Sequence, residues 1–267
     1  MQAQLVDVFT LTKGEGNPAA VVTEAGNLTH IEMAGIAART GLETTFVDGT
    51  TLRYYQPSGM PMTLCGHGTL AALAVLGREG EFQVSTPSGD LRVLVEPHLS
   101  GLQMPPVTLG EPLPPEVAAR GLGIDPSDID GPVQVGSAGR PKLLVPLRST
   151  EALDGLCPDQ AAIDEACAAV GATGIYPFTR KQRVFGAMAD ARHFCTGAGI
   201  YEDPATGVAA VVLGWYLITH GVAPGCSRIK ISQGHAMGRP SLILVRQDDT
   251  GHLWIHGQAV IGGTLDL

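Results

Sequence analysis

The stretch that decides the fold is MTLCGHGTLAALAVLG, residues 62–77. Small and polar residues in its first half run directly into an apolar segment over residues 70–76, which predicts a buried helix. Glycines on both sides of His67 let the backbone turn tightly where this helix begins. The first N–H groups of such a helix have no acceptor inside it and can bind an anion.

A second stretch, EDPATGVAAVVLGWYL over residues 202–217, follows the same plan. When the alanine pairs of the two stretches are aligned, Cys65 falls opposite Asp203 and His67 falls opposite Ala205. An arginine followed by aromatic residues precedes each stretch. We interpret this as an internal duplication with a period of half the chain, which predicts two similar domains that face one cleft.

Composition restricts the kinds of partner. The chain has 267 residues, enough for two domains of ordinary size, and 44% of them are hydrophobic while 16% are charged. Its net charge of −9 argues against nucleic acid and anionic membranes as partners. Neither a signal peptide nor a membrane span is apparent, and five irregularly spaced cysteines indicate a reducing compartment. We therefore expect a cytoplasmic protein.

The pattern along the chain predicts many strands and few helices. Besides the helix after Cys65, helices are expected over residues 28–40, 117–122, 158–170 and 202–219. Strands are expected over residues 3–9, 19–22, 42–47, 51–56, 82–86, 90–97, 101–104, 133–138, 142–147, 174–179, 184–190, 228–233, 241–246 and 253–259. One long apolar helix in each half favours an α+β protein in which a sheet wraps a helix. The proline-rich segment 105–115 predicts domains over 1–110 and 111–267, with the last strand packing back on the first domain.

Eight short motifs together resemble one known family. They are VDVFT, GNPAAVV, LETTFV, LCGHGTLAA, GRPKLLVP, EDPATG, QG with MGRPS, and GQAV. They run in the family's order from Val6 to Val260, and they resemble the PhzF-like (phenazine-biosynthesis-like) isomerases. The resemblance implies the fold of diaminopimelate epimerase: two pseudo-symmetric domains, each a curved, mostly antiparallel sheet around a central helix. It also implies an active site between the domains, no cofactor, a small-molecule carboxylate substrate and a homodimer.

The resemblance also implies roles for particular residues. Glu43 takes the place of the family's catalytic acid/base, and His67 and Asp203 take the places of two polar residues that assist it. The expected substrate-binding positions are Cys65, Gly66, Gly68 and Thr69 in the first half, and Ala205, Thr206, Gly207 and Val208 in the second. Val208 stands where many members have serine, and the run PSGMP at 57–61 lacks a glutamate that members commonly show. Both departures make the pocket less polar.

The residue types fit proton transfer. A carboxyl group in a strand of apolar and hydroxyl residues, as expected for Glu43, has a raised pKa and can take and return a proton near neutral pH. The alternative is a solvated glutamate on an edge strand. His67 could equally be a packed histidine, and Asp203 could simply be a helix N-cap.

Cys65 could take part in thiol or metal chemistry. Proline racemase and diaminopimelate epimerase use two facing thiolates, but the second half has no cysteine at the turn that matches Cys65. We therefore interpret Cys65 as a pocket-wall residue. The pairs Cys65/His67 and His193/Cys195 do not have the spacing of a zinc ribbon or finger, so no metal site is predicted. A dinucleotide site is equally unsupported, because the turn lacks the G-x-G-x-x-G pattern.

The sequence thus favours a cofactor-independent isomerase of a small carboxylate-bearing metabolite, with Glu43 moving a proton between two carbons. Two alternatives stay open. One is an amino-acid or hydroxy-acid epimerase or racemase that uses Glu43 with Cys65. The other is a non-catalytic small-molecule binding protein on the same fold.

Overall fold

The computed structural model describes residues 1–197, 199–224 and 228–267. Internal contacts group the chain into two units. Unit 1 comprises Met1–Gln103 together with His256–Leu267, and unit 2 comprises Met104–Ile255. The division thus falls after Gln103, whereas the sequence placed it at residue 110, and the last segment of the chain groups with the first unit.

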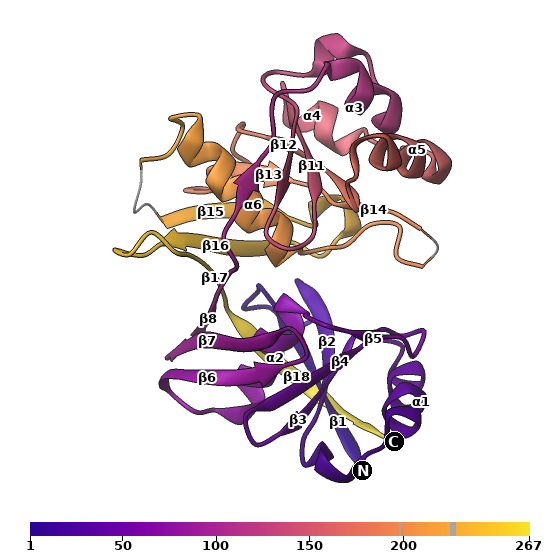
Figure 1. The fold of residues 1–267 in the computed structure, drawn as a ribbon, viewed down its shortest axis with the longest axis vertical. Helices are drawn as coiled ribbons and strands as arrows, with labels where there is room; N and C mark the ends of the chain where they lie inside the picture. Colours follow the sequence, from indigo (N-terminus) through magenta and orange to yellow (C-terminus); the bar gives the residue numbers. More distant parts are fainter. Residues whose placement is uncertain (198, 225–227) are drawn as a thin grey trace. The chain divides into compact units, whose positions relative to one another are not determined.

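Unit 1 is a mostly antiparallel sheet that wraps one helix (Figure 1). Its helices are η1 (Ala25–Asn27), α1 (His30–Thr40) and α2 (Gly66–Leu76). Its strands are β1 (Gln2–Val8), β2 (Asn17–Val22), β3 (Thr44–Asp48), β4 (Thr51–Tyr55), β5 (Pro61–Met62), β6 (Gly80–Thr86), β7 (Gly89–Glu96), β8 (Leu99–Gln103) and β18 (Ala259–Asp266). Helix α2 contacts β1, β2, β3, β8 and β18, so the sheet curves around it. Its residues from Gly66 to Leu73 are buried on every face, as expected for a helix that is hydrophobic all round, while its last turn is half-buried.

Helix α1 begins and ends as its sequence predicts. The Thr29 hydroxyl accepts from the Glu32 amide and the Glu32 carboxylate accepts from the Thr29 amide, which forms a capping box. Gly41 then ends the helix with a positive φ of 66°. Met33, Ile36 and Ala37 form its buried face, whereas Ile31 is 84% exposed.

Unit 2 repeats this plan with more helices on its outside (Figure 1). Its helices are α3 (Pro115–Leu122), η2 (Pro126–Asp128), α4 (Thr150–Asp154), α5 (Gln160–Val170), α6 (Gly207–Thr219) and η3 (His235–Met237). Its strands are β9 (Thr108–Leu109), β10 (Gln134–Ser137), β11 (Lys142–Leu147), β12 (Gly174–Thr179), β13 (Ala189–Ala191), β14 (Phe194–Cys195), β15 (Arg228–Gln233) and β16 (Ser241–Gln247), while β17 (Leu253–Gly257) ends across the division into unit 1. Helix α6 contacts β9, β10, β11 and β16.

The strand pairing shows the duplication directly. In unit 1, β1 pairs antiparallel with β2, and β2 pairs parallel with β3 across the crossover helix α1. In unit 2, β10 pairs antiparallel with β11, and β11 pairs parallel with β12 across α4 and α5. Both halves therefore have an antiparallel strand pair followed by a parallel pair that is connected through helices.

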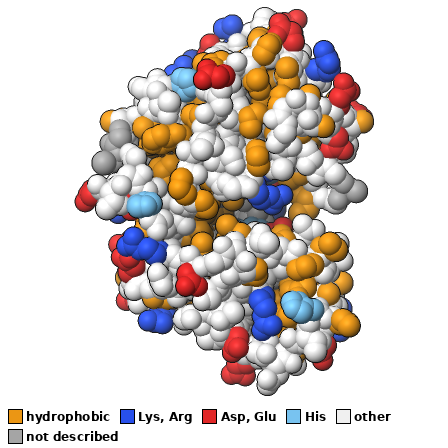
Figure 2. All heavy atoms as spheres, viewed as in Figure 1, with side chains coloured by type: hydrophobic (Ala, Val, Ile, Leu, Met, Phe, Trp, Pro, Cys, Tyr) orange, Lys and Arg blue, Asp and Glu red, His pale blue; other side chains and the backbone are white. Residues whose placement is uncertain are grey.

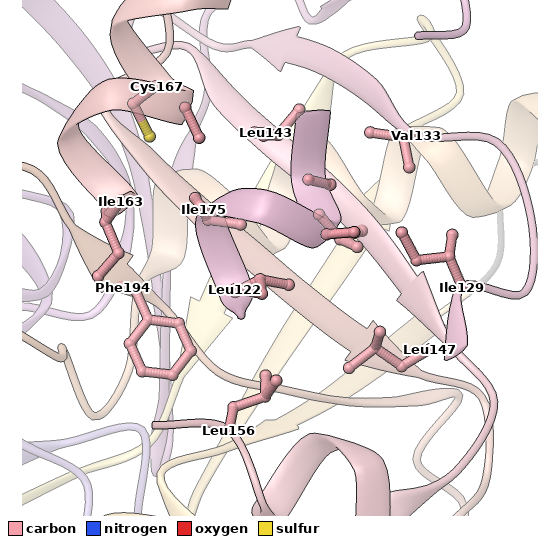
Figure 3. Packing of buried hydrophobic residues seen from close by; sticks show 14 of the residues in the cluster. Leu122, Ile129, Val133, Leu143, Leu147, Leu156, Ile163, Cys167, Ile175 and Phe194 are labelled. Atoms are coloured by element: carbon pink, nitrogen blue, oxygen red, sulfur yellow. The ribbon is translucent and has the colours of Figure 1, made fainter. Parts of the chain in front are cut away.

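The outer helices of unit 2 close a second apolar core (Figure 3). Leu122 of α3 and Ile163 and Cys167 of α5 pack against Leu143 of β11 and Ile175 of β12. Burial raises the pKa of the Cys167 thiol to about 11, so this cysteine behaves as a small hydrophobic residue.

Most predicted elements agree with the structure to within two residues, and four differences affect the site or the sheet. The strand expected at 184–190 is a turn followed by β13, with Phe185 fully exposed. The helix expected from residue 202 begins at Gly207. The strand expected at 253–259 is β17 followed by a separate strand, β18. The strand expected at 42–47 begins at Thr44, so Glu43 lies directly before it.

Within the described ranges, every helix is too short or too polar to cross a membrane. On the face shown in Figure 2, acidic and basic side chains are interspersed, without a continuous basic stripe among the residues drawn in colour.

Candidate active site

Glu43 is positioned by the parallel pairing of β2 and β3. Its carbonyl oxygen accepts from the Ala20 amide at 3.0 Å, one residue before Thr44 enters the ladder opposite Ala20. The side chain is 20% exposed. The carboxylate therefore reaches solvent while its backbone is held by a central strand pair.

The Glu43 carboxylate meets the start of helix α2. Its Oε2 accepts from the Cys65 thiol at 3.2 Å and lies 3.3 Å from His67 Nε2. The Cys65 Sγ is also 3.6 Å from His67 Nδ1. Among the residues described, these three side chains place one donor atom each within 4.8 Å of one another. The sequence placed Glu43 and His67 together in the site; the contact of both with Cys65 is new, and the set could also hold a metal ion.

Cys65 is the N-cap of α2. Its sulfur accepts from the Gly68 amide at 3.3 Å, and its carbonyl accepts from the Thr69 amide at 2.9 Å. A Cβ at Gly68 would lie 2.6 Å from Thr45 Oγ1 and 3.0 Å from Cys65 Sγ, so only glycine fits there without displacing them. The amides of Gly68 and Thr69, which were expected to bind a carboxylate, thus donate to Cys65 instead. The amides of Gly66 and His67 remain as candidates.

Unit 2 holds its own polar cluster at the start of α6. Thr206 is the N-cap, and its hydroxyl bonds the Asp203 carboxylate and lies 2.9 Å from His193 Nδ1. The Asp203 carboxylate lies 3.8 Å from the same nitrogen. Asp203 is therefore a neighbour of the helix start and not its N-cap, in contrast to the simple alternative considered from the sequence.

Gln233 ties this cluster to the sheet. Its amide nitrogen donates to the Asp203 carbonyl at 2.7 Å, and its oxygen accepts from the Thr206 amide and from the Tyr176 hydroxyl. Ala205 and Gly207 are buried beside it, and Val208 is half-buried. The four predicted positions of this turn are thus adjacent, and the sequence did not identify Gln233 or Tyr176 as their support.

The pKa values of His193 and Lys142, both buried in unit 2, are lowered. Burial, followed by the charge of Lys142, lowers the pKa of His193 to about 4 against an opposing contribution from Asp203. Burial, followed by the charge of Arg140, lowers the pKa of Lys142 to about 8. The Lys142 ammonium lies 3.3 Å from the Thr173 hydroxyl. Sequence analysis missed Lys142; a lone lysine opening the apolar strand KLLVPL was the available signal.

Comparison with known proteins identifies the family. The model for phenazine biosynthesis-like proteins matches residues 6–263, nearly the whole chain. The chain belongs to this family. "Uncharacterized isomerase YddE" of Escherichia coli K12 is 33% identical to this PhzF-like chain over 97% of it and 96% of the relative. "Trans-2,3-dihydro-3-hydroxyanthranilate isomerase" of Pseudomonas chlororaphis is 29% identical over 91% of this chain and 89% of that one. The PhzF-like chain is accordingly an isomerase.

Solved structures agree on the fold of this PhzF-like isomerase. The phenazine biosynthesis protein of Bacillus anthracis, of the PhzF family, superposes with a TM-score of 0.90 at 25% identity, covering 100% of this chain and 98% of that one. A probable proline racemase from Agrobacterium radiobacter superposes with a TM-score of 0.62 at 13% identity, covering 100% and 92%. The α+β class predicted from the sequence pattern, and the epimerase-like fold that the family resemblance implied, are therefore confirmed.

Proposed function

We propose that this protein is a cofactor-independent isomerase of a small carboxylate-bearing metabolite, in which Glu43 moves a proton from one carbon to another. The observation that carries the proposal is the contact of the Glu43 carboxylate with His67 and Cys65 at the start of α2. A carboxylate that reaches solvent on one side and is fixed by polar neighbours on the other is suited to take a proton and return it.

His67 supports this assignment through its position. It is 9% exposed, and its Nε2 lies 3.3 Å from the Glu43 oxygen, so it restricts where the carboxylate can point. We assign His67 the role of orienting Glu43. The proton removed from the substrate resides on the Glu43 carboxyl group, where it exchanges with solvent before a proton is returned to the second carbon; the transfer requires no electron acceptor and leaves the oxidation state of the substrate unchanged.

Two further contacts are proposed for the substrate. The amides of Gly66 and His67 at the positive end of the α2 dipole would donate hydrogen bonds to its carboxylate. In unit 2, where the Thr206 amide already donates to Gln233, the Gly207 amide at the start of α6 is the proposed donor. Asp203 would bond an amino or hydroxyl group. The homodimer that the resemblance implies is likewise a proposal, which sedimentation equilibrium would test.

An epimerase or racemase is the second candidate, because the Cys65 thiol donates to the proposed base at 3.2 Å. In that reaction Cys65 would pass a proton to Glu43, which would remove and return the proton at one chiral carbon; delivery to the opposite face would require the two groups to separate from their 3.2 Å contact. The two candidates differ in the product: proton transfer between carbons changes the positions of double bonds, whereas epimerisation inverts one centre.

The first experiment would incubate the purified chain in deuterated water with trans-2,3-dihydro-3-hydroxyanthranilate, the compound named in the P. chlororaphis relative, and in parallel with a metabolite extract. We expect carbon-bound deuterium, or a rearranged product, in one small acid. Deuterium confined to the α-carbon of a chiral acid would favour the epimerase. Binding without exchange or rearrangement of any compound would contradict both and favour a binding protein.

A further inference from the structure

Three side chains of the types that zinc prefers meet at one point of unit 1. Glu43 precedes β3, and Cys65 and His67 come from the first turn of α2. The separations are 3.2 Å between Cys65 Sγ and Glu43 Oε2, 3.3 Å between His67 Nε2 and the same oxygen, and 3.6 Å between Cys65 Sγ and His67 Nδ1. A thiol, an imidazole and a carboxylate therefore surround one small space.

These separations fit a tetrahedral ion. With zinc–sulfur bonds of about 2.3 Å and zinc–nitrogen or zinc–oxygen bonds of about 2.0 Å, neighbouring ligand atoms lie roughly 3.3 to 3.6 Å apart. The Glu43 Oε2 atom lies 3.2 Å from Cys65 Sγ and 3.3 Å from His67 Nε2, close to that range. One ligand atom from each of the three side chains lies within 4.8 Å of the other two, so rotation of the side chains would bring the sulfur and one His67 nitrogen to the third separation. The 20% exposure of Glu43 supplies the route from solvent.

A second observation points to a ligand at the same place. His67 Nε2 is buried and, among the described residues, has no hydrogen-bond partner, since its 3.3 Å approach to Glu43 lacks the geometry of a hydrogen bond. The His67 side chain as a whole is nine-tenths buried. A buried polar atom without a partner is costly, and coordination to a cation would satisfy it.

We propose that Glu43, Cys65 and His67 form a three-ligand Zn²⁺ site whose fourth position is open to water. On binding, the Cys65 thiol releases its proton to the buffer, and the thiolate and the carboxylate together balance the double positive charge of the ion. The bound ion occupies the carboxylate assigned above as the base, so zinc blocks isomerisation; only this last consequence rests on the proposed function.

Cobalt(II) tests the site without any substrate, because it substitutes for zinc and reports its ligands by absorption. Titration of the metal-free chain with Co²⁺ should produce a thiolate-to-cobalt charge-transfer band and the visible bands of a tetrahedral ion, at one equivalent per chain. Added Zn²⁺ should remove both. Absence of the charge-transfer band would overturn the proposal.

Variants locate the ligands. Cys65→Ser should abolish the charge-transfer band, and Glu43→Gln and His67→Gln should each weaken Zn²⁺ binding by at least about tenfold, since even the loss of an outer-shell partner costs that much. Cys195→Ser is the matched control, because the Cys195 sulfur also lies 3.6 Å from a histidine nitrogen, that of His193. It should leave the band unchanged. A band lost in Cys195→Ser and kept in Cys65→Ser would place the metal elsewhere and overturn the proposal.

Two measurements on the unmodified chain avoid variants that fail to fold. X-ray absorption of the zinc-loaded chain should show one sulfur among nitrogen and oxygen ligands, whereas a shell without sulfur would refute the site. The solvent-exchange activity should fall in proportion to zinc loading and return with a chelator. Zinc that binds through Cys65 without affecting an established activity would refute the blocking role alone, and zinc binding in a chain without activity would tell against the proposed function.

Discussion

At the residue scale, the duplicated halves differ where the chemistry is proposed. The parallel ladders pair Ala20 with Thr44 in unit 1 and Leu143 with Ile175 in unit 2, so Glu43 corresponds to Gly174. A Cβ at Gly174 would lie 2.6 Å from His193 Nε2. The second half therefore has an imidazole packed where the first half has a carboxylate side chain.

His193 makes stability depend on pH. Its pKa is about 4 in the folded chain and 6.5 in the unfolded one, so the unfolded state binds more protons between these values. The full contribution is present above pH 6.5 and is lost as the pH falls through 4, on the order of 3 kcal/mol in total. Chemical denaturation at several pH values should show this slope, and His193→Gln should flatten it. An equal slope in the variant would assign the acid sensitivity to other groups.

Lys142 makes stability depend on pH in the alkaline range. Its pKa is about 8 when folded and 10.5 when unfolded, and the side chain is 2% exposed. Stability should therefore rise between pH 8 and 10.5, because the unfolded state keeps its proton longer. Lys142→Met removes the buried charge, so it should be more stable than wild type at pH 7, with an advantage that shrinks by roughly 3 kcal/mol toward pH 10.5. A constant difference across this range would show that Lys142 does not titrate as described.

At the element scale, the start of α2 depends on one close approach. Gly68→Ala should push a methyl group into Thr45 and the Cys65 sulfur, which costs about 1–3 kcal/mol and displaces the cap. Gly35→Ala in α1 is the control, since a Cβ there meets nothing within 4 Å and should stabilise by about 0.5–1 kcal/mol. Urea denaturation of both variants compares them. If the two variants changed the free energy of unfolding equally, the start of α2 would have room for a methyl group despite its close packing.

The sequence predicted correctly those elements whose ends are set by neighbouring residues. The capping box and final glycine of α1 depend on neighbours in sequence, and both are visible in the letters. The segment 184–190 has apolar residues at strand spacing, but the Ala187 amide turns back to the Val184 carbonyl, and Phe185 stays in solvent. Strand β18 was missed because its partner, β1, lies at the other end of the chain.

In the candidate site, too, local motifs predicted individual residues but not the contacts between distant segments. Glu43, His67 and Asp203 could be named from motifs, but the contact of Glu43 with Cys65 follows from the pairing of β2 with β3 and from the cap of α2. The buried Lys142 and the support from Gln233 arise only when distant strands meet. Such contacts depend on register, which periodicity does not specify.

At the scale of the whole molecule, the C-terminal segment His256–Leu267 belongs to the same unit as Met1–Gln103. Strand β18 pairs with β1 over its whole length, so residues 1–103 alone lack one neighbour of β1. We expect residues 1–103 to unfold without a cooperative transition, and the same segment joined by a flexible linker to 256–267 to unfold cooperatively. Urea denaturation followed by circular dichroism distinguishes the two. Cooperative unfolding of 1–103 alone would show that β18 is dispensable.

The central claim is that Glu43 carries the proton. The most direct test is the rate of deuterium incorporation from solvent into the identified substrate, measured for wild type, Glu43→Gln and Cys65→Ser under the same conditions. We predict that incorporation is lost in Glu43→Gln and survives in Cys65→Ser. Incorporation that persists in Glu43→Gln and disappears in Cys65→Ser would contradict the account and make the thiol the proton carrier.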